Sequence, residues 1–179
     1  PYSWKRFLFP PVQKMWSAKR TKNGFEIEDD APKPEKLAFI GVRPCEISAL
    51  QIQDKVFDNG DFADRGYNAR RKKTLIIAVN CTRAADTCFC ASMDTGPAAK
   101  SGFDLALTEV SDGKNHRFVI ESGSKKGESL LKGLNTKAAE PGDTSAAATR
   151  VNAAKRGMKR TLPKDAARIL ERNREQIGR

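Results

Sequence analysis

Two uninterrupted runs of apolar residues limit how this chain can fold. The first run is Leu37–Val42 and the second is Leu75–Val79, and each has the length of one buried strand. Between them, apolar residues recur at roughly helical spacing from Cys45 to Phe57, directly after a proline that suits the first turn of a helix. A strand, a helix and a second strand in this order form a βαβ unit, so the two strands are predicted to be parallel neighbours.

The later part of the chain predicts a hairpin followed by helices. Strand-like stretches from Asp104 to Val110 and from His116 to Glu121 flank a turn-forming segment of Ser, Asp, Gly and Asn. Beyond this hairpin we expect a short helix over Ser124–Leu134, a small and polar linker over Thr136–Ala148, and an exposed helix over Lys164–Gln176.

These elements predict an α/β fold in two parts. Residues 1–135 are expected to form a cysteine-bearing domain with a small mixed sheet, built from the βαβ unit and the hairpin. Within it, Asp58–Tyr67 is rich in Gly and Asp and is expected to be a loop. Residues 136–179 are expected to form the linker and a basic helical tail, with ten Lys or Arg residues between Arg150 and Arg179. Such a tail is more often a solvated helix than a binding surface.

The formal net charge of +11 indicates an acidic partner surface, an anionic cofactor or a nucleic acid. Nucleic acid is the least favoured partner, because the sequence has no RNA-binding aromatic motif, zinc finger with paired histidines or helix-turn-helix pattern. No apolar run reaches the roughly 18 residues that a membrane-spanning helix needs, and residues 1–20 lack the apolar core of a secretory signal. We therefore expect a cytoplasmic protein. The first residue is Pro, which favours a sequence that begins inside a longer chain.

Cysteine side chains follow both predicted parallel strands at the point where each strand ends. Cys45 and Cys81 each come within three residues of a strand's last apolar residue. Because the carboxyl ends of parallel strands meet at one edge of a sheet, both thiols are expected at that edge, where open α/β sheets usually place ligands. Cys88 and Cys90 lie in the loop that leaves the second strand. The sequence therefore predicts that four thiols converge on one site.

Four thiolates around one centre suit a [4Fe–4S] cluster or a structural zinc ion. The paired C-x-x-C steps of zinc ribbons and ferredoxins are missing here, so the spacing does not choose between the two. The thiols could also be buried and inert, or could form a pair of disulfides, although disulfides are rare in a reducing compartment. A catalytic cysteine would need a histidine, and the single His116 lies in a predicted hairpin strand.

Side chains near the cysteines suit a negatively charged bound group. Arg43 and Arg83 can offset the charge of a cluster held by thiolates. Thr87, Ser92 and Thr95, together with backbone N–H groups of residues 91–96, can donate hydrogen bonds to cluster sulfurs and so tune a redox potential.

The cysteines also lie within recognisable motifs, which reach to about Gly127. These motifs are Phe7–Pro11, Phe39–Glu46, Ala78–Cys81, Asp86–Met93, Gly96–Pro97 and Ser101–Leu107. Together they resemble the 4Fe-4S dicluster family, whose members are similar to the beta subunit of sulfhydrogenase and to the corresponding iron–sulfur component of anaerobic sulfite reductase. The cysteine-bearing motifs are specific to this family, and the basic tail is not.

The resemblance implies an iron–sulfur subunit of a hydrogenase- or sulfite-reductase-type complex. Such a protein is not itself expected to be an enzyme, because it passes electrons from a flavin-containing subunit to a catalytic subunit. The resemblance favours iron–sulfur over zinc on Cys45, Cys81, Cys88 and Cys90. Family members continue into a ferredoxin-like domain that this sequence lacks, so the likeness is to the amino-terminal part. Asp94 stands where the family's loop is expected to have glycine, and a side chain there restricts the backbone.

Overall fold

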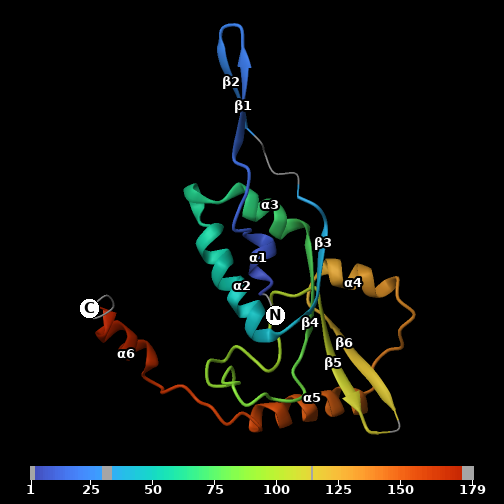
Figure 1. The fold of residues 1–179 in the computed structure, drawn as a ribbon. Helices are drawn as coiled ribbons and strands as arrows, with labels where there is room; N and C mark the ends of the chain where they lie inside the picture. The colour runs from blue at the N-terminus through green and yellow to red at the C-terminus, as the bar shows by residue number, and fades with distance from the viewer. Residues whose placement is uncertain (1–2, 30–33, 114, 175–179) are drawn as a thin grey trace.

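A four-stranded sheet with strand order β3-β4-β5-β6 forms the centre of the structure (Figure 1). The structure is a computed structural model, and it describes residues 3–29, 34–113 and 115–174. β3 (Leu37–Val42) pairs in parallel with β4 (Thr74–Val79), and β4 pairs in parallel with β5 (Leu105–Ser111). β6 (His116–Ser122) is antiparallel to β5. The predicted parallel pair, the hairpin and the mixed α/β fold are confirmed.

Two helices connect β3 to β4. The predicted helix is present as α2 (Pro44–Phe57). The expected loop over Asp58–Tyr67 instead holds a short 3-10 helix, η1 (Gly60–Phe62), and the start of α3 (Arg65–Lys73). α3 begins there because the Asp64 carboxylate accepts a hydrogen bond of 2.6 Å from the Tyr67 N–H and so caps its first turn. Tyr67 is fully buried, which holds the helix against the core.

The core lies between these helices and one face of the sheet. α1 (Lys5–Leu8) closes it at one end, where Trp4 and Phe7 lie with ring centroids 5.0 and 5.8 Å from Phe39. Such aromatic contacts add to the gain from burying apolar area. The buried core residues are Leu8, Phe39, Val42, Ile47, Leu50, Tyr67, Ile76, Ala78, Phe103 and Ala106.

The second face of the sheet is apolar but largely bare. Both connections, from β3 to β4 and from β4 to β5, run over the core face, because right-handed crossovers between successive neighbouring strands stay on one side. Strand alternation sends Ile40, Ile77, Leu107 and Phe118 to the other side. There Ile40 keeps 64% of its surface exposed and Phe118 keeps 48%.

α4 (Lys125–Lys132) confirms the short helix expected after the hairpin. Ser124 caps it, since its Oγ accepts from the Gly127 N–H at 3.0 Å and donates to Asp104 Oδ1 at 2.6 Å. Gly127 is buried against the backbone at the start of β5, where an added Cβ would lie 1.9 Å from the Asp104 carbonyl oxygen. This close approach fixes α4 to the amino-terminal end of the sheet.

α5 (Pro141–Arg156) occupies much of the stretch expected to be a linker, so that expectation is wrong for its second half. Pro141 suits the first helical turn, and Asp143 Oδ2 accepts from the Glu140 N–H at 3.2 Å. Alanine-rich sequence then favours helix, and α5 buries Ala147 and Ala154. The expected last helix is present as α6 (Ala166–Arg172), while its predicted end at residues 175–176 lies outside the described residues.

A second hairpin, β1 (Trp16–Thr21) with β2 (Gly24–Asp29), was not expected from the sequence. It projects from the body above α3 in Figure 1. Its pairing places Trp16, Phe25 and Ile27 on one side, all at least 60% exposed. Among all the helices that the structure describes, none is both long and apolar enough to cross a bilayer.

Candidate functional site

Cys45 and Cys81 lie at the carboxyl edge of the parallel strands. Cys45 is in the first turn of α2, directly after β3, and Cys81 is two residues beyond the end of β4. Since β3 and β4 are parallel neighbours, both residues leave the sheet at the same edge. The chain after β4, drawn in green, passes near the amino end of α2 (Figure 1).

Arg43 links these two cysteine segments. Its Nη1 donates to Cys81 Sγ at 3.4 Å, and its backbone N–H donates to Glu46 Oε2 at 3.4 Å. The hydrogen bond to Cys81, and then the charge on that sulfur, raise the pKa of the Arg43 guanidinium, and Cys45 adds to the effect. The expected cation beside the thiols is therefore present at Arg43. The same role for Arg83 stays a prediction.

The loop after β4 is anchored by the buried amide of Asn80. Its Nδ2 donates to Thr108 Oγ1 at 2.9 Å, and its Oδ1 accepts from the Ala99 N–H at 2.8 Å. The next residue, Cys81, donates its N–H to the Pro97 carbonyl at 3.0 Å. These bonds fold the far end of the loop back onto β4, so the segment with Cys88 and Cys90 is closed at both ends.

Inside this loop, the two remaining cysteines lie in tight turns. The Ala85 N–H donates to Cys88 Sγ at 3.4 Å, and the Cys90 carbonyl accepts from the Thr95 N–H at 3.0 Å. Gly96 passes so close to the site that an added Cβ would lie 2.9 Å from Cys90 Sγ. The space beside that sulfur therefore depends on a residue without a side chain.

Two hydroxyl groups expected to serve a cluster bind the loop instead. Ser92 Oγ donates to the Phe89 carbonyl at 2.8 Å, and Thr95 Oγ1 lies 3.5 Å from the Cys90 carbonyl oxygen that accepts its proton. Because a hydroxyl has one proton to donate, these two groups stabilise the turn. The role expected of Thr87 stays a prediction.

The four thiols are close enough to influence one another's protonation. Burial raises the pKa of the Cys90 thiol, and the charges of the other three cysteines raise it further. Burial also raises the pKa of Cys45, and the charge of Cys81 has the next largest effect. Among the described residues, no group of three or more His, Cys, Asp or Glu side chains is placed to hold a metal ion. Binding of one group by all four cysteines therefore stays a prediction.

The residues present fit an iron–sulfur cluster in their chemistry. Thiolates are soft ligands, which suit iron–sulfur clusters and zinc better than hard cations. The Arg43 guanidinium offsets negative charge at one side, and Gly96 leaves room beside Cys90. The sole histidine is not part of the site, because His116 Nε2 lies 2.8 Å from Glu109 Oε1 within the hairpin.

Comparison with curated proteins points to one class of complex. Over 127 residues, or 71% of this chain, the sequence is 31% identical to sulfhydrogenase 2 subunit beta of Pyrococcus furiosus. The chain is similar to a hydrogenase subunit. It spans about a third of that relative's length, since the match covers 34% of it. No family model matches the chain, and no solved structure matches it. The likeness to the sulfhydrogenase subunit therefore supports the resemblance seen in the motifs, without showing the dicluster family.

Asp94, which departs from the glycine expected in proteins like the sulfhydrogenase subunit, has a left-handed backbone with φ of 56°. Glycine adopts this conformation without steric cost, whereas other residues do so rarely. The Asp94 carboxylate contacts Lys100 Nζ at 2.5 Å, and this contact lowers its pKa. Both side chains of the pair are well exposed, so the pair adds little to stability.

Replacing Asp94 with glycine is expected to raise the thermal midpoint of unfolding by about 2–4 °C, because the left-handed conformation is then unstrained. Asp94→Ala is the matched control, since it also removes the contact with Lys100 but keeps a Cβ. It should be no more stable than the parent chain. Thermal unfolding followed by circular dichroism tests this, and equal midpoints for the Gly and Ala variants would contradict it.

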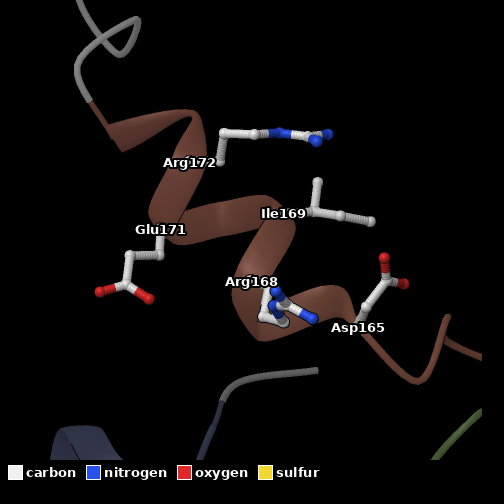
Figure 2. Close-up of a pocket in the computed structure, with 5 residues that line it drawn as sticks. All are labelled: Asp165, Arg168, Ile169, Glu171 and Arg172. Carbon is white, nitrogen blue, oxygen red and sulfur yellow. The ribbon is translucent and has the colours of Figure 1, made fainter.

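A surface hollow on α6 is not part of the cysteine site. Figure 2 shows its lining side chains projecting from this one helix. They are Asp165, Arg168, Ile169, Glu171 and Arg172. Because all of them come from α6 and its first flanking residue, the hollow follows the outer surface of a single helix.

Proposed function

We propose that this chain is part of an iron–sulfur electron-transfer subunit of a hydrogenase- or sulfite-reductase-type complex. The observation that carries this proposal is the gathering of four cysteines at the carboxyl edge of a parallel sheet. The partial similarity to a sulfhydrogenase beta subunit supports the same class. In this proposal the chain carries electrons and does not catalyse the reaction of its complex.

Cys45, Cys81, Cys88 and Cys90 are proposed to hold a [4Fe–4S] cluster. When bound, such a cluster supplies a one-electron redox centre whose potential depends on charge, hydrogen bonds and solvent exposure. Arg43 holds positive charge 3.4 Å from the Cys81 sulfur and so favours its thiolate form. Asn80 fixes the start of the loop through two hydrogen bonds, which limits how far the loop cysteines can move.

The proposed partners are a flavin-containing subunit, which supplies electrons, and a catalytic subunit, which receives them. Phe89 and Met93 support a contact near the cysteines, because they lie in the same loop and remain 44% and 50% exposed. Apolar side chains beside a redox centre can exclude water where two subunits meet. The net charge of +11 favours an acidic surface on the subunit that docks there.

Protein purified without oxygen is expected to contain iron and acid-labile sulfide in equal amounts, about four of each per chain, with a broad visible absorption that reduction bleaches. Metal analysis, a sulfide assay and absorption spectra test this together. Zinc without sulfide would replace the proposal with a structural metal site in a docking domain. Protein with neither metal nor sulfide would indicate free thiols.

A further inference from the structure

The chain after α5 crosses directly over the cysteine loop. We call residues Gly157–Leu162 the covering segment. At its start, Met158 Sδ lies 3.9 Å from Cys90 Sγ. At its end, the Leu162 N–H donates to Ser92 Oγ at 3.0 Å. The segment is thus attached on both sides of the short turn that begins at Cys90.

The start of the covering segment is close-fitting. An added Cβ on Gly157 would lie 3.8 Å from the Cβ of Ala84, which is van der Waals contact with the beginning of the loop. Met158 is half-buried, although most of its neighbours in the chain are exposed. A methionine suits this place, since its flexible thioether fills irregular gaps and tolerates contact with other sulfurs.

Positive charge accompanies the covering segment. Lys159 Nζ lies 3.5 Å from Asp86 Oδ1, and both side chains are highly exposed. Lys155, at the end of α5, contributes after Lys100 to lowering the pKa of Asp94 on the far side of the turn. Each such contact is weak in water. Together they place cations around a loop whose thiolates would carry negative charge.

We propose that the covering segment shields the cysteine site, and that Met158 is the residue that limits access of solvent and small reagents to Cys90. The attachment at Met158 and at Leu162 supports this role, because the two contacts bracket the turn that carries the sulfur. The shield itself does not require a metal, and only its protection of a bound cluster rests on the proposed function. In that case Met158 is a positioning residue, and it need not bind iron.

Alkylation of the metal-free, reduced chain by iodoacetamide tests the shield. Peptide mass spectrometry gives the rate at Cys90 relative to the rate at Cys45, which is exposed and serves as the internal reference. Met158→Ala should raise this ratio by roughly threefold or more, because thiol reactivity follows access. Met158→Leu should keep the parent ratio, since leucine restores most of the volume without the sulfur.

Ser92→Ala provides an independent variant, because it removes the acceptor that attaches the far end of the covering segment. It should also raise the relative rate at Cys90. Unchanged ratios in both Met158→Ala and Ser92→Ala would overturn the proposal, as would a rise in Met158→Leu equal to that in Met158→Ala. Iron-free parent protein that still shows this pattern would reject the cluster and keep the shield. In iron-loaded protein, Met158→Ala should lose its visible absorption in air faster than Met158→Leu.

Discussion

Replacing Cys90 with serine is expected to reduce the iron of anaerobically purified protein from about four atoms per chain to well under one. Cys90 is the cysteine whose pKa responds to all three other thiols, so its loss removes a ligand from the centre of the group. A serine hydroxyl is a harder and much less acidic ligand than a thiol, and it does not replace a thiolate on iron. Iron and sulfide assays together with absorption spectra measure the effect.

Thr87→Ser is the matched control for this experiment, because it changes an exposed residue of the same loop by one methyl group. It should keep the iron content of the parent protein. Circular dichroism should show that Cys90→Ser remains folded, since the core contains no cysteine. Parent-like iron in the Cys90→Ser protein would remove Cys90 from the ligand set. Loss of iron through unfolding would show as a loss of helical signal.

Replacing Gly127 with alanine is expected to lower the free energy of unfolding by about 3 kcal/mol. The added methyl group would lie 1.9 Å from the Asp104 carbonyl oxygen, which is backbone and cannot rotate away. α4 must therefore move away from the start of β5, with loss of the contacts that Ser124 makes there. Urea unfolding followed by circular dichroism measures the change.

Gly142→Ala is the matched control, because it makes the same change in another helix. Gly142 has no atoms within 4 Å of an added Cβ, and alanine is the better helix former. This variant should be neutral or more stable by about 0.5 kcal/mol. An equal loss of stability in Gly127→Ala and Gly142→Ala would contradict the packing of α4 described here.

The sheet was predictable because its signal is local. Two apolar runs and an intervening helical period are enough to propose parallel strands, and parallel strands place Cys45 and Cys81 at one edge. α3 was missed because charged residues surround it, and one buried ring, Tyr67, determines its packing. The β1–β2 hairpin did have a signal, since Asn23-Gly24 is a common two-residue turn motif.

The geometry of the cysteine loop was less predictable, because bonds between distant residues determine it. Asn80 joins the loop to Thr108 on β5, which lies 28 residues further along the chain. Met158 reaches Cys90 from 68 residues away. Neither contact leaves a periodic pattern or a spacing rule in the sequence. The departure at Asp94 was the exception, since its left-handed backbone agrees with the glycine expected from related loops.

The bare face of the sheet has a consequence for the colloidal behaviour of this chain. Phe39 and Ile40 are adjacent, yet the first is 3% exposed and the second 64%, so only the first contributes substantially to the core. Exposed apolar patches promote association. The net charge of +11 opposes association through repulsion, which salt screens beyond about 8 Å at physiological ionic strength. Dispersion of the isolated chain in water is therefore a balance between one apolar surface and its charge, largely independent of how tightly the core is packed.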